Sequence, residues 1–441
     1  MKNQIGVAKF GGTSVGTVAS IYKCVDIVKN NQDIKVVVVS AQAGVTNLLE
    51  KLIKSDVYTY KKIFADLYCI VDPIVQSIMQ TRNEKIASLF RELEKLCQEL
   101  YLDNKSKFRL QSQILSFGER ISAYIFDHAL KQQGISSAHI DAREIIKADG
   151  SYIKARPLLK DIKSQAKKYF SDSRKLYVMG GFIGSNLDGE TVVLGRGGSD
   201  YSAALVAEAV SADMLYIWTD VAGIHQADPR LIPKSQVIKQ INFEEAIELI
   251  GFGAKVLHPD TLWPVMRSGT KVFVGSTFDP ASGGTYITND NEGIVTRGVR
   301  AIAERRGQSL IKVNLVSLDL SDIVYKVLAV LRKYDITPDV INLTDVELIL
   351  VIDDTNTITY QSINNELIDL CEDEFEFEFE KNLSLTALVG DKLDTIPQFF
   401  NELLNGLGDL DVKYSGYSSR GKSWCLITAD DAFEKVYKAL F

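Results

Sequence analysis

The residues best suited to chemistry lie in the first strand-like run and in the turn after it. Residues 7–10 are mostly apolar and include Lys9, and two glycines and two hydroxyl residues follow at 11–14. Glycine lets the backbone approach an anion closely, and Lys9 supplies a cation at the strand end where α/β folds place ligands. We expect Thr13 or Ser14 to cap the next helix. The pattern predicts a phosphate cradle, and an ordinary turn between strand and helix is the simpler alternative.

A second strand repeats this logic. Residues 36–39 are four consecutive valines, which is typical of a strand buried on both faces of a parallel sheet. The small-residue loop after it contains Ser40 and Thr46, whose hydroxyls we expect near the same sheet edge. A helix cap explains either hydroxyl equally well.

We expect a mostly helical stretch over residues 48–130, in which Leu89, Leu93, Leu96 and Leu100 form one apolar face. One glutamate stands out in this stretch. Glu119 follows Gly118, and glycine inside a helix lowers its stability. The glycine therefore indicates that another part of the chain approaches closely. A solvated glutamate is the usual alternative.

Strand-like and helical runs alternate over the rest of the first 275 residues. Residues 176–181, 191–194 and 215–218 predict strands, a glycine-rich turn at 195–202 precedes a helix, and residues 271–274 predict the last strand. Such alternation predicts a mostly parallel α/β sandwich. The polar loop at residues 279–293 marks a domain boundary.

Beyond that loop the pattern changes to a tandem repeat. Two successive βαββαβ patterns predict two ferredoxin-like units, and the first helix of the second unit is expected at residues 395–404. Between them, residues 374–380 alternate strictly between Glu and Phe, which predicts a strand with its three Phe side chains inward.

Composition excludes several classes of function. The net charge of −7 argues against nucleic acid as a partner, and no run is long and apolar enough to span a membrane. The first residues lack the apolar core of a signal peptide, and five scattered cysteines are typical of reduced thiols, so we expect a cytoplasmic protein. The four histidines form no metal-binding spacing, and we expect no built-in metal site.

Taken together and in this order, the motifs resemble those of the aspartokinases. The residues that carry the resemblance are KFGGTS at 9–14, the loop with Thr46 and Asn47, Gly118 and Glu119, GRGGSD at 195–200, Thr219 and Asp220 with DPR at 228–230, and KVLHP at 255–259. The resemblance covers essentially the whole chain. It implies an amino-acid kinase-like α/β/α sandwich at residues 1–290 and two ACT domains at 306–380 and 381–441.

The resemblance also implies an activity. Such enzymes transfer the γ-phosphoryl group of ATP to the β-carboxylate of L-aspartate, the first step toward lysine, threonine and methionine. ATP would bring Mg²⁺ with it. The ACT pair implies a homodimer or a higher homo-oligomer, and the end of the chain after the second repeat implies a monofunctional enzyme without a homoserine dehydrogenase.

Site residues carry over from the resemblance position by position. Catalytic roles fall to Lys9, Asp200 and Lys255. Aspartate would be bound by Ser40, Thr46, Glu119, Phe182, Arg196 and Ser199. The nucleotide would be bound by Lys9, Gly11, Gly12, Thr219, Asp220, His225, Arg230, Lys255 and Val256. At His225 the family usually has a tyrosine, so this contact departs from the pattern. For Asp200, capping of the following helix is the alternative.

The same resemblance places an amino-acid effector, lysine or threonine, on the first ACT unit. The residues expected there are Ser317, Ser321, Ile323, Val324, Thr337, Asp339, Thr344 and Asp345. Asp322 replaces a glycine that is common at its position, which leaves the effector open. The alternative is that the ACT pair only dimerises.

Two other functions remain alternatives. In the first, the chain is another kinase of the same superfamily, acting on glutamate, acetylglutamate or a nucleotide. In the second, it is a catalytically inactive amino-acid sensor. The tandem repeat and Glu119 argue against the first. The joint presence of Lys9, Glu119, Arg196, Asp200 and Lys255 argues against the second.

Overall fold

The computed structural model divides the chain into two compact units. Unit 1 comprises Met1–His225, Gln236–Ile250 and Lys255–Val295, and unit 2 comprises Gln226–Ser235, Gly251–Ala254 and Thr296–Phe441. The structure describes residues 4–440 except 57, 81–82, 103–105, 173, 255–256, 290–297, 316–319, 355–356, 372–374, 392, 394–404, 406, 409, 418–421 and 430–431. No helix in the described part is long and apolar enough to cross a membrane.

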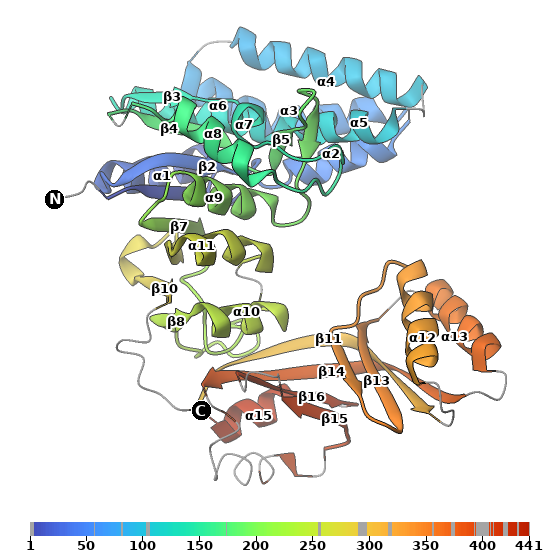
Figure 1. Cartoon of the computed structure of the whole chain (residues 1–441). Coiled ribbons are helices and arrows are strands. Elements are labelled where there is room, and N and C mark those ends of the chain that lie inside the picture. Colours follow the sequence, from blue (N-terminus) through green and yellow to red (C-terminus); the bar gives the residue numbers. More distant parts are fainter. Residues whose placement is uncertain are drawn as a thin grey trace. The chain divides into compact units, whose positions relative to one another are not determined.

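Unit 1 is built on an eight-stranded sheet with the strand order β3-β4-β2-β1-β7-β9-β10-β8 (Figure 1). The neighbouring strands from β3 to β9 are parallel. The strand bounds are β1 (Gly6–Phe10), β2 (Ile34–Val39), β3 (Ser137–His139), β4 (Leu176–Gly180), β7 (Met214–Thr219), β8 (Gln240–Asn242), β9 (Lys271–Ser276) and β10 (Gly284–Thr288). A separate hairpin joins β5 (Ile183–Ser185) and β6 (Thr191–Val193).

Helices cover both faces of this sheet. Every residue of β1 and β4 is buried, as expected for strands of apolar sequence inside a parallel sheet. The four valines of β2 are buried too, which confirms that prediction. The helices of unit 1 are α1 (Val18–Asn30), α2 (Val45–Lys54), α3 (Tyr60–Met79), α4 (Glu84–Leu102), α5 (Lys107–Leu115), α6 (Phe117–Gln132), α7 (Ala142–Ile145), α8 (Leu159–Tyr169), α9 (Gly198–Ala209), α10 (Phe243–Gly251) and α11 (Leu262–Ser268), with 3-10 turns η1 (Pro259–Thr261) and η2 (Pro280–Ser282).

The helical stretch after β2 forms one apolar layer, as predicted. In α4, Leu89, Leu93 and Leu100 are buried, and Leu96 packs against the same core. This core continues through α3 and α6 to the valines of β2. The helices therefore hold α6, and with it Glu119, firmly against the sheet.

The last part of unit 1 differs from the prediction. We expected β9 to be the final strand and residues 279–293 to be a loop, whereas β10 lies within that loop and runs antiparallel to β9. The short strand β8 was also not predicted, and it pairs with β10. The polar composition of this segment did not predict a strand. Buried Thr285 stabilises β10, because its hydroxyl accepts a hydrogen bond from the Ile224 amide and donates one to the Ile238 carbonyl.

The cap of α1 also corrects a prediction. Thr17 is the N-cap, and its hydroxyl accepts from the Ser20 amide while the Ser20 hydroxyl accepts from the Thr17 amide. This reciprocal capping box satisfies two amides at the helix start. Neither Thr13 nor Ser14 caps the helix, and the hydroxyl of Ser14 instead hydrogen-bonds that of Thr277 at 2.7 Å.

Unit 2 is a six-stranded antiparallel sheet with the order β12-β13-β11-β14-β16-β15 (Figure 1). Its strands are β11 (Gly298–Leu315), β12 (Val340–Leu343), β13 (Glu347–Asp353), β14 (Phe375–Asp391), β15 (Val412–Tyr417) and β16 (Ser423–Thr428). Its described helices include α12 (Leu320–Lys333), α13 (Thr357–Cys371) and α15 (Phe433–Leu440). The fold agrees with the expected α/β sandwich followed by ferredoxin-like ACT units.

The two long central strands join the two halves of that sheet. The first half of β11 pairs with the second half of β14, next to β16, and the second half of β11 pairs with the first half of β14, next to β13. The half that contains β15, β16 and α15 thus takes its fourth strand from residues 298–306. The boundaries at 306–380 and 381–441 stay a prediction.

The alternating Glu and Phe segment is the start of β14. Phe375 is buried, Phe377 and Phe379 are partly buried, and all three pack on the core of the first half, as predicted. The helix predicted at residues 395–404 lies outside the described residues.

Candidate active site

The loops that follow the parallel strands meet at one edge of the unit 1 sheet. Each is tied to the neighbouring strand end by a backbone hydrogen bond: Gly181 N to Val39 O, Ser40 N to Phe10 O, Gly11 N to Trp218 O and Thr277 N to Thr219 O, at 2.8–3.1 Å. This edge is the carboxyl end of the strands, where open α/β sheets bind ligands.

A cavity of about 570 Å³ opens at this edge and collects most of the predicted residues. They come from β1 and the glycine turn, from the loop after β2 and the start of α2, from the loops after β4 and β6, from α6 and from the start of α9. Nine of them line the cavity: Lys9, Gly12, Ser40, Thr46, Glu119, Phe182, Arg196, Ser199 and Asp200. Sequence motifs far apart in the chain therefore form one site.

Lys9 and Asp200 form an ion pair inside this cavity. The Lys9 Nζ lies 2.6 Å from the Asp200 Oδ1, and both side chains are largely buried. Lys9 lies on β1 and Asp200 in the first turn of α9. The carboxylate fixes where the ammonium group points, so that Lys9 faces the cavity in a defined position.

Asp200 does not cap α9. The N-cap is Gly197, which has a φ of +69° and no room for a side chain, because a Cβ there would lie 2.3 Å from the Cβ of His258. Asp200 lies three residues later, inside the first turn. The capping alternative is therefore wrong, and the start of this helix faces the cavity through Gly198, Ser199 and Asp200.

Glu119 is buried in the cavity wall. Its Oε1 accepts a hydrogen bond from the Ala41 amide at 3.1 Å, and its Oε2 has no hydrogen-bond partner among the described residues. Burial raises the pKa of Glu119 to about 8, against which the Ala41 amide acts only partly. As expected, Gly118 allows a close approach, since a Cβ there would lie 2.6 Å from the Cβ of Ala41.

The glycine turn offers amides to an anion. In the described residues, the amide of Gly11 donates to the Trp218 carbonyl, whereas the amides of Gly12, Thr13 and Ser14 have no acceptor. Backbone amides without an acceptor in such a turn are able to bind an anion, and Gly12 presents its amide at the cavity. Ala41 and Ala43 crowd Gly12, so a side chain would not fit there.

Two exposed cationic residues also line the cavity. Arg196 is exposed and has no ion-pair partner among the described residues. Lys154 also lines the cavity, with a φ of +56°, and Phe182, another lining residue, has a φ of +65°. Left-handed backbone at a non-glycine residue is costly and gathers at functional sites.

Sequence reasoning missed several residues of this cavity. Gln42, Asn47 and Lys154 line it, and none of them was assigned a role. Gln42 is in the loop between two predicted residues, Ser40 and Thr46, and Asn47 directly follows Thr46 in α2, and this proximity was the available signal. Nothing in the sequence around Lys154 indicated a site.

The predicted nucleotide residues are only partly placed. Thr219 ends β7, next to β1, and its hydroxyl donates to the Asp220 carboxylate. His225 is half-buried and pairs through its backbone with Val237. Arg230 belongs to unit 2, where its guanidinium binds Asp228. Lys255 and Val256 lie outside the described residues.

The predicted effector residues lie around α12, β12 and the turn after it, and Ser317 is outside the described residues. Ile323 is buried in the core of unit 2, Ser321 and Thr337 are exposed, and Val324 is partly buried. The Asp339 carboxylate pairs with Arg305 at 2.9 Å. Burial raises the pKa of Asp339, and Arg305 opposes that shift.

The turn between β12 and β13 holds the last two predicted effector residues. Thr344 is exposed, and its hydroxyl accepts from the amides of Val346 and Glu347. Asp345 is exposed beside it. Thr344 thus shapes the turn.

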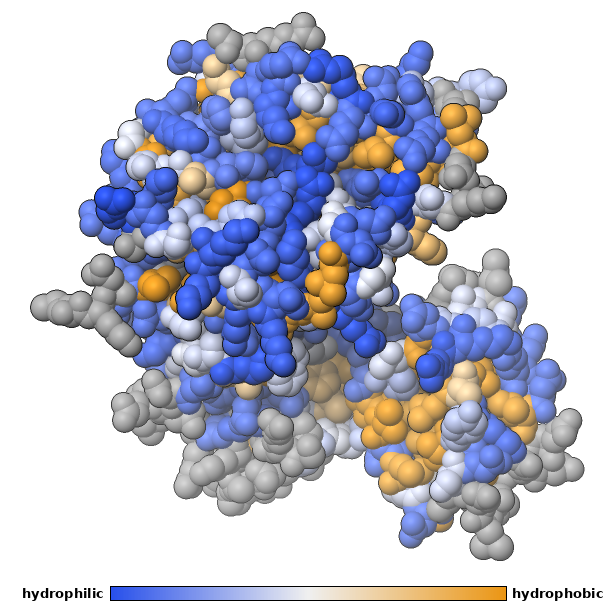
Figure 2. Space-filling view, turned by 45° about the horizontal axis from the view of Figure 1, so that its top comes forward, coloured by the Kyte–Doolittle hydropathy of each residue, from blue (hydrophilic) through white to orange (hydrophobic). Residues whose placement is uncertain are grey.

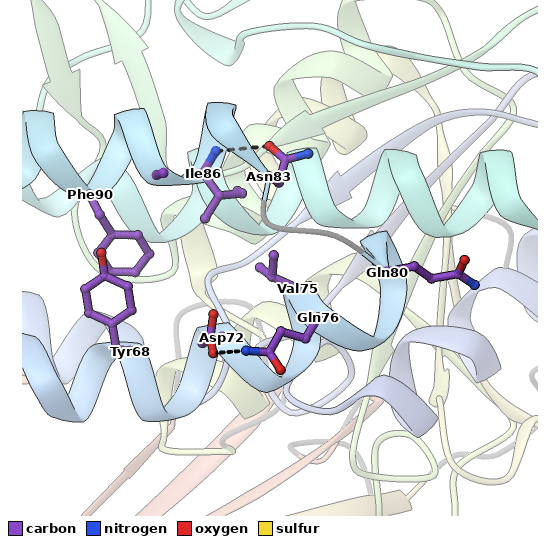
Figure 3. A pocket seen from close by; sticks show the side chains of 9 residues that line it. Tyr68, Asp72, Val75, Gln76, Gln80, Asn83, Ile86 and Phe90 are labelled. Atoms are coloured by element: carbon purple, nitrogen blue, oxygen red, sulfur yellow. Dashed lines mark hydrogen bonds between the residues drawn. The ribbon is translucent and has the colours of Figure 1, made fainter.

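A larger cavity, of about 690 Å³, contains none of the predicted residues. It lies between α3 and α4 in the helical layer, where the stacked rings of Tyr68 and Phe90 close one end (Figure 3). Asp72 and Gln76 hydrogen-bond each other on its α3 wall (Figure 3). No group of three His, Cys, Asp or Glu side chains in the described part of the chain is arranged to hold a metal ion.

Comparison with known proteins gives one consistent result. Residues 4–276 match the model of the amino acid kinase family. Lysine-sensitive aspartokinase 3 of Escherichia coli is 33% identical over 99% of this chain and 98% of its own length. An aspartokinase of Chlamydia pneumoniae is 33% identical over 88% of this chain and 86% of its own.

Solved structures agree with this result. The crystal structure of E. coli aspartokinase III in complex with aspartate and ADP, in the R-state, has a TM-score of 0.84 at 31% identity and covers 99% of this chain and 100% of its own. The complex of the same enzyme with lysine and aspartate, in the T-state, has a TM-score of 0.81 at 32% identity and covers 99% and 98%.

Proposed function

The chain belongs to the amino acid kinase family and, within it, to the aspartokinases, and from this premise we propose how its residues transfer the γ-phosphoryl group of ATP to L-aspartate. The product is 4-phospho-L-aspartate, formed on the β-carboxylate, and the reaction opens the route to lysine, threonine and methionine. The observation that carries the assignment of roles is the single cavity that unites Lys9, Glu119, Arg196 and Asp200.

Aspartate binds through its two charged α-groups. The exposed guanidinium of Arg196 receives the α-carboxylate, which its planar fork matches in a bidentate manner. The free Oε2 of Glu119 accepts the α-ammonium group. Ser40, Thr46 and Ser199 add hydroxyls, and Phe182 shapes the wall beside them. The β-carboxylate is left pointing toward the glycine turn.

The transfer step needs no general base. A free aspartate carboxylate has an ordinary pKa near 4 and is ionised at neutral pH. Its oxygen attacks the γ-phosphorus, the bond to the β-phosphate oxygen breaks, and ADP leaves with that electron pair. The work of the site is to position two anions and to stabilise the transferring group. Lys9 and the amide of Gly12 supply that stabilisation, and Asp200 orients Lys9.

The nucleotide lies on the β7 side of the cavity. Thr219 and Asp220 at the end of β7 are next to β1 in the sheet, and His225, Arg230, Lys255 and Val256 complete the assignment from the family motifs. The amide of Gly11 already donates to the Trp218 carbonyl. Gly11 therefore contributes by letting the backbone come close to the nucleotide. Mg²⁺ would enter with ATP and would offset the charge of its phosphates.

Unit 2 carries regulation. We assign the effector to the region of Ser321, Val324, Thr337, Asp339, Thr344 and Asp345, with Ile323 supporting it from the core and Ser317 in the same assignment. Lysine is the effector we favour over threonine, because a relative that matches 99% of the chain is named lysine-sensitive. The chain acts as a homodimer or higher homo-oligomer through its ACT units, in the cytoplasm.

A hydroxamate assay tests the function directly. Purified enzyme with Mg-ATP and hydroxylamine should give aspartyl hydroxamate from L-aspartate, and little product from glutamate or acetylglutamate. Lysine and threonine are titrated separately at sub-saturating aspartate. Activity with glutamate or acetylglutamate instead of aspartate would favour another kinase of the family, and binding of lysine without turnover would favour an inactive sensor.

A further inference from the structure

Among the described residues that line the cavity, Gln42 is the one buried polar residue without an assigned role. It lies in the loop between β2 and α2, lines the 570 Å³ cavity and is only 1% exposed. Neither its Oε1 nor its Nε2 has a hydrogen-bond partner among the described residues. A buried amide without a partner is destabilising, and nearly all buried polar groups in folded proteins have one.

The position of Gln42 connects the two functional ends of the cavity. Its predecessor, Ala41, donates its amide to Glu119, and its successor, Ala43, donates its amide to the carbonyl of Gly12. The side chain therefore belongs to a loop that is anchored at both the ammonium-binding carboxylate and the glycine turn. Such a loop has little freedom to move, and the amide has no alternative partner within it.

Glu119 also has a buried polar atom without a hydrogen-bond partner among the described residues, its Oε2. An ammonium group has three N–H donors, and one carboxylate oxygen satisfies only one of them. A neutral amide oxygen accepts a second donor without adding charge, and the amide NH₂ can donate to a carboxylate oxygen of the same molecule.

We propose that Gln42 is a specificity-determining contact for the amino-acid substrate, in which its carboxamide hydrogen-bonds the ammonium and a carboxylate oxygen of bound aspartate beside Glu119. The proposal rests on the proposed function, since it names a further residue of the same site. It assigns the amide to the amino acid and not to the nucleotide, because Gln42 directly follows Ala41, whose amide donates to Glu119, and both Gln42 and Glu119 line the cavity with unpartnered polar atoms.

The test compares Gln42→Met with the wild type. Met keeps the unbranched length of Gln but makes no comparable hydrogen bonds. We expect the KM for aspartate to rise about 10- to 100-fold, the range for a hydrogen bond to a charged group. We expect the KM for ATP to stay within twofold. The Tm of the ligand-free protein should stay equal or increase, because the variant loses no partner and no longer buries an unpaired amide.

A matched control comes from unit 2. Gln308 is also fully buried, but its Nε2 donates to the Gly307 carbonyl and to Asp353. Gln308→Met should lower the Tm and leave the KM for aspartate unchanged when no effector is present. The pair thus separates a substrate contact from a structural amide.

Any other result contradicts either the role proposed for Gln42 or the proposed function. An unchanged KM for aspartate in Gln42→Met, in an active enzyme, overturns the proposal and leaves the function intact. A clear fall in the ligand-free Tm, or failure of the variant to fold, also overturns it, because it reveals a structural partner. A wild type without aspartate kinase activity contradicts the proposed function itself.

Discussion

Lys9 illustrates how a single side chain acquires its role from its surroundings. Its ammonium group is held at 2.6 Å by Asp200, at the carboxyl end of β1 and beside the free amides of the glycine turn. The sequence identified both residues through motifs separated by most of unit 1. What it did not reveal is the ion pair, which depends on how α9 packs against β1.

We expect Lys9→Met to lower kcat by about 10² or more, the scale for loss of one group that stabilises transition-state charge. The KM for aspartate should change much less, because Arg196 and Glu119 carry the α-groups. Steady-state kinetics with varied aspartate checks this. A turnover close to that of the wild type would exclude Lys9 from phosphoryl transfer.

Glu119 makes substrate binding depend on pH. With a pKa of about 8 in the ligand-free protein, its carboxyl is mostly protonated at pH 6 to 7 and ionises as the pH rises. Only the ionised form pairs with an ammonium group. The KM for aspartate should therefore fall with increasing pH, by about tenfold per pH unit well below 8, and level off above it.

Glu119→Gln provides the control for that profile. The variant cannot ionise, so its KM for aspartate should be high and nearly independent of pH between 6 and 8. A wild-type KM that is flat over this range would show that Glu119 is already ionised in the free enzyme, contrary to the effect of its burial.

Residues such as Gln42 and Lys154 mark the limit of sequence reasoning. A motif carries information about side chains whose types are restricted, such as the glycines and charged groups here. Gln42 matters because its two amide atoms lack partners, and Lys154 because its backbone is left-handed. Both properties arise from three-dimensional packing and leave no pattern in the chain.

At the scale of elements, strands and helices with a strong apolar pattern were predicted well, and those with a weak apolar pattern were not. The valine strand β2 and the leucine face of α4 are as expected. The strands β8 and β10 are short and polar, and β10 is stabilised by hydrogen bonds of Thr285 that no local pattern announces. The α1 cap was placed too early because Ser14 bonds to Thr277 instead.

Strand β11 contains a link within unit 2. The Arg305 guanidinium pairs with Asp339 and Asp353 at 2.9 Å and also donates to the Gly251 carbonyl. Gly253, with a φ of +111°, packs on the same side chain, since a Cβ there would lie 2.7 Å from the Arg305 Cγ. The segment at 251–254 directly precedes the predicted nucleotide residue Lys255.

Arg305→Met should therefore weaken feedback inhibition while the uninhibited activity stays within a few-fold. An effector that competes for Asp339 releases Arg305, and without Arg305 this event no longer affects Gly251. We expect the concentration of lysine for half inhibition to rise at least about fivefold, the lower end of typical allosteric coupling.

The neighbouring Arg306 supplies a control for this prediction. Its side chain is largely exposed and pairs with Glu304. Inhibition curves for Arg306→Met should superimpose on those of the wild type. Identical curves for Arg305→Met and the wild type would show that Arg305 has no part in coupling.

At the scale of the whole molecule, the sheet of unit 2 ends in strands that expose hydrophobic residues. Figure 2 shows a hydrophobic patch on the visible face of this unit. On the edge strand β12, Ile341 and Leu343 are about half exposed, and Val346 follows in the turn. An unpaired edge with apolar side chains is a template for pairing with another copy.

We expect Ile341→Lys to shift the protein from dimer to monomer in light scattering after size exclusion at micromolar concentration. Ile368 on α13 is the matched control, because both residues are 54% exposed and only Ile341 lies on the edge strand. Ile368→Lys should leave the molar mass unchanged. A wild type that is monomeric, or two variants that behave alike, would rule out this edge as the contact.

The two units share the chain in an interrupted way, and this has a consequence for how such proteins are shortened or recombined. Residues 226–235 and 251–254 belong to unit 2 although unit 1 supplies the residues on either side of them. Ala227 and Ile232 pack into the unit 2 core around Trp424 and Phe433. A cut near residue 295 would strip these apolar side chains of their cover. The regulatory unit therefore cannot be removed by a single cut, because the kinase fragment alone would expose an aggregation-prone apolar surface. Loss of regulation during evolution would proceed through point substitutions more readily than through truncation.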